Sequence, residues 1–117
     1  MQGSDVHFQV DTVGDVLVAV VSATKIGHEN LDRFGEQLKE IVSSNQGVSI
    51  VLDMSSVMFI ASIAIGRIFS ARKQILDSGG AFTIVAKSPA VLHVFDDCRL
   101  AHITKIFHTL DEALDEH

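Results

Sequence analysis

Alternating and continuous runs of hydrophobic residues mark several segments of the chain as β-strands. Val6, Phe8 and Val10 alternate with polar residues, a pattern typical of a strand with one buried face. The run Val16–Val21 is almost entirely aliphatic, which favours a strand covered on both faces. Because only a short turn around Gly14 separates the two runs, they are predicted to pair as a hairpin. Further strands are expected at Val48–Met54, Phe82–Ala86 and Ile103–Phe107.

Between the strands, apolar residues recur at helical spacing. A first amphipathic helix is expected over residues 31–42, and a second from Ile65 to the turn Ser78-Gly79-Gly80. Ser88 followed by Pro89 predicts the start of a third helix, because serine caps helix N-termini and proline suits the first turn. The inward stripe of the second helix is expected to contain Ile65, Ile68, Phe69, Ile75 and Leu76.

The alternation of strands and helices indicates the α/β fold class. After the N-terminal hairpin, a helix precedes each strand. This order predicts a mixed, mostly parallel sheet of about five strands with about four helices, the last at residues 110–114. A chain of 117 residues that is 47% hydrophobic and 21% charged can form one globular core. We therefore expect a single domain over residues 1–117.

The charge balance and the cysteine count narrow the functional class. Fifteen acidic and nine basic residues give a net charge of −6, which argues against binding to a nucleic-acid backbone. The single cysteine, Cys98, cannot form an internal disulfide, and its apolar neighbours predict a packed thiol. The longest uncharged stretch, Met54–Gly66, has 13 residues, whereas a membrane-spanning helix needs about 20. With no signal-peptide pattern at the start, we expect a cytoplasmic protein without membrane insertion.

The histidines do not form a recognisable metal motif. None are spaced as i, i+2 or as His-Glu-x-x-His, and no second thiol accompanies Cys98. The glycine-rich phosphate-binding loops and the Gly-x-Ser-x-Gly nucleophile motif are missing from the sequence. We therefore expect no metal, no cofactor and no enzymatic activity. The histidines, expected on the surface, are His7, His28, His93, His102, His108 and His117.

A phosphoacceptor aspartate of the receiver type is the enzyme-like alternative. Asp53 ends a buried strand, as the acceptor does in such domains, and Lys105 falls in the last strand. A receiver also needs paired carboxylates after its first strand to hold magnesium, and Asp11 and Asp15 flank a hairpin turn instead. A simpler role for Asp53 is to accept hydrogen bonds from the turn at residues 55–56.

The segment Val51–Ile68 resembles the signature of STAS domains, the anti-sigma-factor antagonist family. It begins Val-Leu-Asp-Met-Ser, continues through a loop with Phe59, and reaches Ala-Ser-Ile-Ala-Ile-Gly at a helix start. The family pattern is Val-Leu-Asp-Leu-Ser, a loop with Phe, then Asp-Ser-Ser/Thr-Gly-Leu-Gly. The turn at residues 78–80, the helix start at 88–91 and the closing segment 103–114 follow in the family's order. The resemblance covers essentially the whole chain and implies a STAS-type fold.

The resemblance implies a regulatory binding module rather than an enzyme. In this bacterial family, a partner anti-sigma factor that is itself a serine kinase phosphorylates the serine after the motif aspartate. Unphosphorylated, the domain binds that kinase and frees the sigma factor. Phosphorylation breaks the complex, and a serine phosphatase resets it. Carried over by position, the acceptor is Ser62.

Three positions beside Ser62 depart from the main family pattern. Ala61 replaces the aspartate, Ile63 the second Ser/Thr and Ala64 the glycine, while Gly66 is kept. A variant branch reads Ser-Ser-Ala-Ala-Leu-Gly here, and this chain is more similar to that branch. The departures bear on kinase recognition, so a second function stays open. It is an unphosphorylated STAS scaffold subunit in a lipid-transport or stress-signalling assembly.

The position of Ser62 suits two physical roles. As the expected N-cap of the second helix, its hydroxyl would contribute about 1 kcal/mol. The same helix start would also accommodate a phosphate, whose charge would disturb an apolar contact with a partner. Ile63 is predicted to face away from the core, so it is either part of a contact patch or an isolated surface residue. The candidate partner-binding residues are Phe59, Ile60, Ala61, Ser62, Ile63 and Arg67.

Overall fold

The computed structural model describes residues 5–117, which form an α/β structure. Its main sheet has the order β1-β2-β4-β6-β7, in which only β1 and β2 run antiparallel to each other. This arrangement confirms the predicted mixed, mostly parallel sheet with an N-terminal hairpin. The main strands are β1 (His7–Val13), β2 (Val16–Ser22), β4 (Ser49–Asp53), β6 (Phe82–Val85) and β7 (Lys105–Phe107), and a small parallel pair joins β3 (Lys25–Ile26) to β5 (Phe59–Ile60).

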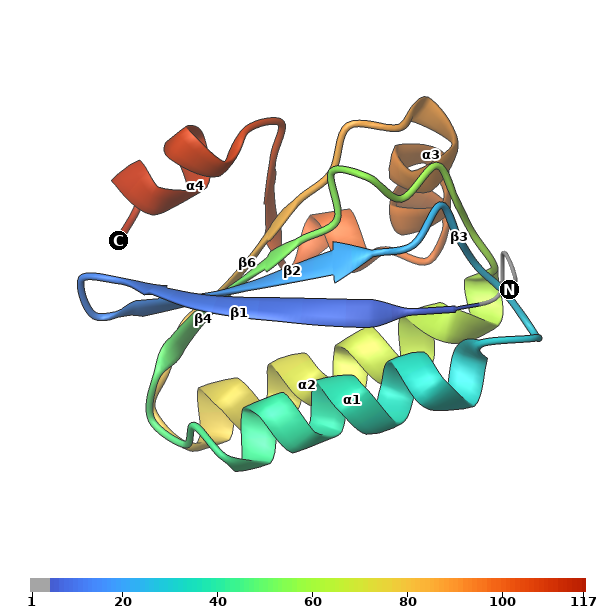
Figure 1. Cartoon of the computed structure of the whole chain (residues 1–117). Coiled ribbons are helices and arrows are strands. Elements are labelled where there is room, and N and C mark those ends of the chain that lie inside the picture. The colour runs from blue at the N-terminus through green and yellow to red at the C-terminus, as the bar shows by residue number, and fades with distance from the viewer. Residues whose placement is uncertain (1–4) are drawn as a thin grey trace.

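The helices cover both faces of the main sheet (Figure 1). Two long helices lie side by side on one face, and the short C-terminal helix lies on the other. The predicted helices all form, and two short 3-10 turns accompany them. They are α1 (Leu31–Ser43), η1 (Ser62–Ala64), α2 (Ile65–Asp77), α3 (Pro89–Asp97), η2 (Leu100–His102) and α4 (Leu110–Asp115).

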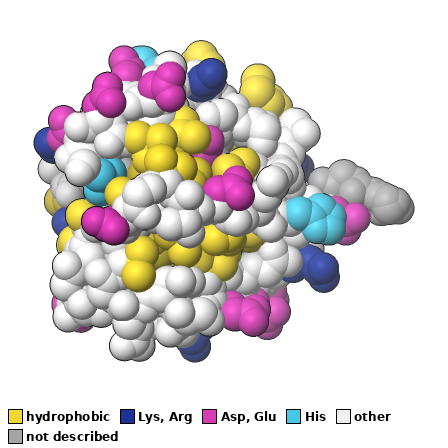
Figure 2. All heavy atoms as spheres, turned by 60° about the vertical axis from the view of Figure 1, so that its left-hand side comes forward, with side chains coloured by type: hydrophobic (Ala, Val, Ile, Leu, Met, Phe, Trp, Pro, Cys, Tyr) yellow, Lys and Arg dark blue, Asp and Glu magenta, His cyan; other side chains and the backbone are white. Residues whose placement is uncertain are grey.

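The two-sided covering explains why the central strands lack a polar alternation. In β4, Ile50 and Leu52 belong to the large core that includes the inner faces of α1 and α2. Val51, between them, belongs to a second cluster that includes Ala113 of α4. Figure 2 shows hydrophobic side chains at the surface on the hairpin-turn side of the molecule, with acidic side chains around them. The second cluster is thus only partly covered, since Val20, Phe107, Leu110 and Leu114 are half-buried.

The hairpin turn has the backbone geometry that its sequence favours. Gly14 and Asp15 alone separate the paired residues Val13 and Val16, and Gly14 has a φ of +61°. A two-residue hairpin with glycine at its first position matches the right-handed twist of the flanking strands. A second glycine, Gly80, is required for space, because a Cβ there would lie 2.4 Å from the carbonyl oxygen of Val48.

Two predictions about the core are wrong in detail. Val10 is 43% exposed because β1 is an edge strand with one neighbour. Leu76 is 41% exposed because the buried stripe of α2 runs through Ile68, Ala71 and Ile75, which leaves Leu76 at its rim. The strand expected at Ile103–Phe107 begins only at Lys105.

Candidate partner-binding site around Ser62

The turn after β4 is fixed by Asp53 at the end of the sheet. Asp53 is 8% exposed, and its Oδ1 accepts hydrogen bonds from the Ser55 amide at 3.0 Å and the Ser55 hydroxyl at 2.5 Å. The predicted structural role of Asp53 is therefore confirmed for Ser55. Ser56 instead donates from its hydroxyl to the carbonyl oxygen of Val21 at 2.8 Å, which ties the turn to β2.

Backbone hydrogen bonds then hold the loop that follows. The Met58 amide donates to the Thr24 carbonyl at 2.7 Å, and the Ala61 amide donates to the Ile26 carbonyl at 2.8 Å. Between these two anchors, β5 pairs in parallel with β3. The side chains of Met58 and Phe59 consequently project into solvent, with exposed fractions of 46% and 57%.

The prediction that Ser62 is the N-cap of the second helix is wrong. The chain enters α2 through η1, whose N-cap is Ala61 in an extended conformation, with φ −76° and ψ 142°. The Ala64 amide donates to the Ala61 carbonyl at 2.9 Å, so the helical path starts one residue earlier than expected. Ser62 is the first residue of this turn and is exposed. Within residues 5–117, its hydroxyl has no hydrogen-bond partner, and it therefore has no capping function.

The candidate binding residues separate into exposed and buried members. Ile63 is 54% exposed, in agreement with its predicted outward position. Ile60 is only 7% exposed and belongs to the core, because β5 turns its second side chain inward, so it cannot contact a partner. Ala61 is half-buried. Met58 is also exposed, although the sequence did not predict it as a binding residue. The contact surface is defined as four exposed residues: Met58, Phe59, Ser62 and Ile63.

Arg67 borders this surface on α2 and joins it to α1. Its guanidinium lies 3.2 Å from a carboxylate oxygen of Asp32, and both side chains are well exposed. A Cβ at Gly35 would lie 2.9 Å from Cδ of Arg67, so the arginine stem lies against the bare backbone of α1. Arg67 is thus held in place by α1 at the rim of the contact surface.

Comparison with known proteins identifies the family. The family model described as "STAS domain" matches residues 7–113. The chain belongs to the STAS domain family. A protein of Thermotoga maritima provisionally named an anti-sigma factor antagonist is 29% identical over 109 residues, which span 93% of this STAS domain chain and 96% of the relative.

Solved structures share the fold of this STAS domain. An anti-sigma factor antagonist from Mycobacterium paratuberculosis has a TM-score of 0.85 at 22% identity, over 97% of this chain and 94% of the other. The anti-sigma factor antagonist SpoIIAA in its unphosphorylated form has a TM-score of 0.74 at 18% identity, over 94% and 95% of the two chains. A phosphorylated form of SpoIIAA has also been solved. The chain is therefore an anti-sigma factor antagonist-like STAS domain.

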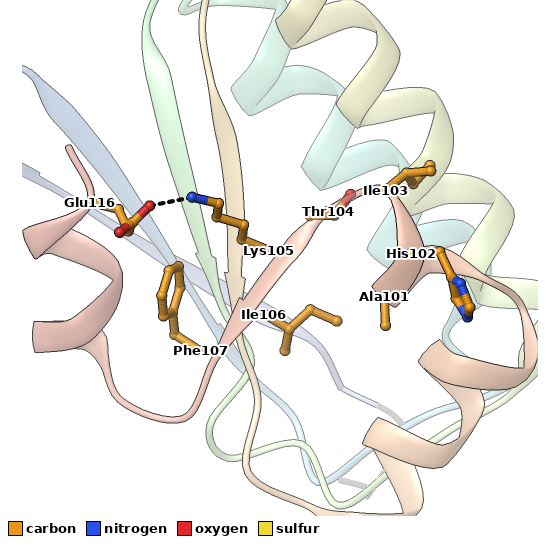
Figure 3. A pocket seen from close by; sticks show the side chains of 8 residues that line it. All are labelled: Ala101, His102, Ile103, Thr104, Lys105, Ile106, Phe107 and Glu116. Carbon is orange, nitrogen blue, oxygen red and sulfur yellow. Dashed lines mark hydrogen bonds and ion pairs between the residues drawn. The ribbon is translucent and has the colours of Figure 1, made fainter.

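The structure contradicts the receiver alternative for this STAS domain. Lys105 points toward α4, where its Nζ lies 2.5 Å from a carboxylate oxygen of Glu116 (Figure 3). That contact lowers the pKa of Glu116, first through the hydrogen bond and then through the lysine charge. Asp15 directly precedes Val16, which pairs with Ser49, the first residue of β4. Asp53 is the last residue of β4, so Asp15 and Asp53 lie toward opposite ends of that strand. The acceptor, the lysine and the acidic pair therefore do not form one site.

Other candidate chemistry in the STAS domain is equally dispersed. In the described part of the chain, no three His, Cys, Asp or Glu side chains are grouped as a metal site requires. His93 lies 3.3 Å from Asp97 on the surface of α3. Cys98 is half-buried and packs against the main core. A shallow hollow of about 580 Å³ runs along β7 (Figure 3), and the contact surface contributes none of its lining residues. No helix among residues 5–117 is long and apolar enough to span a membrane.

Proposed function

We propose that this STAS domain is a non-enzymatic anti-sigma factor antagonist that binds an anti-sigma factor with serine kinase activity. The contact surface of Met58, Phe59, Ser62 and Ile63 is the binding site in this proposal. One observation carries it: the exposed Ser62 hydroxyl has no structural partner in the described chain and lies in sequence beside exposed apolar side chains. Exposed apolar groups beside a polar rim are typical of an interface.

Phosphorylation of Ser62 would act as the switch. A phosphoserine adds a charge of about −1.5 to −2 and three acceptor oxygens. In the free domain, the N–H groups at the start of η1 and α2 would accommodate that charge, so the fold should persist. In the complex, the same charge would have to lose water against an apolar partner surface. The modification would therefore weaken binding rather than unfold the domain.

Further parts of the proposal rest on family likeness. The likeness to SpoIIAA, solved in unphosphorylated and phosphorylated forms, supports a phosphorylation switch. A serine phosphatase would restore the binding-competent form. Residues 1–117 would act as one domain, and the protein would work in the bacterial cytoplasm.

A second function is favoured by the residues on either side of Ser62. Ala61 carries no carboxylate, and Ile63 no hydroxyl, at positions where the family motif has them. A kinase that reads those groups would not recognise this helix start. The second candidate is therefore an unphosphorylated STAS scaffold subunit that uses the same contact surface in a lipid-transport or stress-signalling assembly.

Two measurements distinguish these functions. The domain is immobilised, proteins bound from lysate of its source organism are eluted, and each is tested for kinase activity toward the domain with ATP. Mass analysis of the peptides locates any phosphate. Phosphate on Ser62, absent from Ser62→Ala and still present in Ser70→Ala, supports the switch; Ser70 is an exposed serine on the same helix. Binding that is lost in Ile63→Glu, with no phosphate transferred, supports the scaffold. Kinase binding that Ile63→Glu does not change would contradict the proposed surface.

A further inference from the structure

The two edges of the main sheet are protected very differently. At one edge, β7 has three residues and begins with Lys105. At the other edge lies β1 (Figure 1). This strand has seven residues, and its register with β2 continues without a bulge from His7 to Val13. Natural edge strands are usually short, bulged, or carry lysine or proline, because an open edge pairs with other strands. β1 has none of these features.

The hairpin turn determines which backbone groups of β1 are free. In a two-residue hairpin the flanking residues, here Val13 and Val16, exchange the first pair of hydrogen bonds. Hydrogen-bonded pairs then alternate along an antiparallel ladder, so Asp11 and Gln9 also bond toward β2. The N–H and C=O groups of Phe8, Val10 and Thr12 point to the open edge. No hydrogen bond within residues 5–117 links these groups to another element.

We propose that β1 pairs antiparallel with β1 of a second copy of this chain, joining two sheets into one. The two-fold axis passes between Gln9 of one copy and Gln9 of the other. In this register, Phe8 and Val10 of opposite copies exchange backbone hydrogen bonds through the groups that face the open edge. The inference does not depend on the proposed function, because β1 contributes no residue to the contact surface.

Complementary side chains select the second copy and this register, because an imidazole N–H can donate a hydrogen bond to a carboxylate oxygen. With Gln9 on the axis, His7 of each copy lies opposite Asp11 of the other, in closely spaced pairs whose side chains share one face. Both side chains are exposed in the single chain. If the axis passed between the two copies of Asp11 instead, their carboxylates would lie opposite each other. The strand therefore complements itself in the antiparallel sense.

The apolar face of β1 also gains from this pairing. The Phe8 ring stacks on Phe34 of α1 at a centroid distance of 5.9 Å, so even-numbered residues of β1 face the helices. Val10 shares that face and is 43% exposed. In the proposed register, Val10 lies opposite Phe8 of the second copy, a pairing of a β-branched with an aromatic side chain that stabilises sheets.

Sedimentation equilibrium of the full chain tests the proposal. The wild-type protein should form dimers, and added salt should tighten them because each copy has a net charge of −6. Val10→Pro should abolish dimers, since it removes an N–H that faces the open edge but none that bonds to β2. Val10→Thr, which keeps that N–H and the branched side chain, is the matched control and should dimerise. Circular dichroism checks that Val10→Pro is folded, and Val10→Lys replaces it if it is not.

The register is tested by exchanging the side chains at positions 7 and 11. His7→Asp should weaken the dimer by about tenfold, because two carboxylate–carboxylate pairs replace two imidazole–carboxylate pairs. The double variant His7→Asp, Asp11→His restores complementary pairs and should recover most of that loss. A wild-type chain that stays monomeric up to about 1 mM would overturn the proposal. So would a dimer that both Val10→Pro and Val10→Lys leave intact. A dimer that the double variant fails to restore would overturn the register.

Discussion

The hydroxyl of Ser88, the N-cap of α3, donates a 2.7 Å hydrogen bond to the carbonyl oxygen of Met58 in the loop before β5. The Ser88 hydroxyl oxygen in turn accepts a hydrogen bond from the Val91 amide at 3.4 Å, in the capping arrangement that the sequence predicts. Ser88 is only 4% exposed. One buried hydroxyl thus links the start of α3 to the loop that presents Met58 and Phe59.

Ser88→Ala should lower the free energy of unfolding by about 2 kcal/mol, about half from the lost cap and half from the lost hydrogen bond to Met58. Binding to the partner should weaken as well, because the loop loses an anchor. Thr109→Ala is the control, since Thr109 caps α4 by accepting from the Glu112 amide at 3.2 Å and is exposed. It should lower stability by about 1 kcal/mol and spare binding. Urea unfolding measures the stability loss of each variant. Equal losses in Ser88→Ala and Thr109→Ala would mean that the hydrogen bond from Ser88 to Met58 adds nothing beyond the cap.

Ser62→Ala should change stability by less than about 0.5 kcal/mol, as for an ordinary surface substitution. The expectation of a lost cap fails because Ala61 occupies the N-cap position and the Ser62 hydroxyl has no partner among residues 5–117. Ser62→Asp should also fold normally and should weaken partner binding, because its carboxylate mimics part of the phosphate charge. Thermal unfolding measures the stability of the two variants, and a binding titration measures the affinity of Ser62→Asp for the partner. A stability loss of about 1 kcal/mol in Ser62→Ala would mean that Ser62 is a cap after all.

The order of sheet and helices was predictable because it depends on local patterns. Each element forms where its own residues show the pattern: alternation in β1, aliphatic runs in the central strands, and the Ser88-Pro89 cap at the start of α3. The start of α2 was not predictable in this way. Alanine is a poor N-cap, and Ala61 becomes one because its amide bonds to Ile26, far away in the sequence.

The contact surface was predictable only in part for the same reason. β5 has two residues, and its pairing with β3 turns Phe59 outward and Ile60 inward. Two adjacent apolar residues give no periodicity from which to choose the buried one. Met58 was missed because its exposure depends on its anchor to Thr24, a contact with no local signal.

Gly80→Ala and Gly66→Ala should affect stability in opposite directions. A Cβ at Gly80 would lie 2.4 Å from the Val48 carbonyl oxygen, a clash with backbone that needs the chain to move, so a loss above about 1 kcal/mol is expected. At Gly66, in the first turn of α2, a Cβ meets nothing within 4 Å. Alanine is a better helix former than glycine, so a gain of up to about 1 kcal/mol is expected there. Denaturant midpoints measure both, and a stabilised Gly80→Ala would contradict the close approach.

The Lys105–Glu116 pair should be visible as a titration effect. The hydrogen bond and charge of Lys105 lower the pKa of Glu116, so the carboxylate form is favoured in the folded state. The small stabilisation that results is present above the ordinary pKa of a glutamate and is lost as pH falls through the lowered value. In Lys105→Gln, the pKa of Glu116 should rise toward its ordinary value, as measured by NMR titration of its side chain. An unchanged titration in that variant would mean that the two groups do not pair in solution.

Ile63→Glu tests the contact surface most directly. Ile63 is 54% exposed, so the substitution should change the stability of the free domain by less than about 0.5 kcal/mol. In the complex, an unpaired carboxylate would lose its water against apolar groups, and affinity should fall at least tenfold, or about 1.4 kcal/mol. Isothermal titration calorimetry with the purified partner measures the affinity.

The matched control for Ile63→Glu is the same change at Leu76. Leu76 is a 41% exposed apolar residue in the last turn of α2, while Ile63 lies in the turn that leads into that helix. Leu76→Glu adds the same charge to the same helical segment, so its effect on affinity reports only the general electrostatic change. A tenfold loss in Ile63→Glu with little loss in Leu76→Glu would support the surface around Ser62. Equal losses of affinity would show that net charge governs binding. No loss in either variant would show that the partner binds another face of the domain.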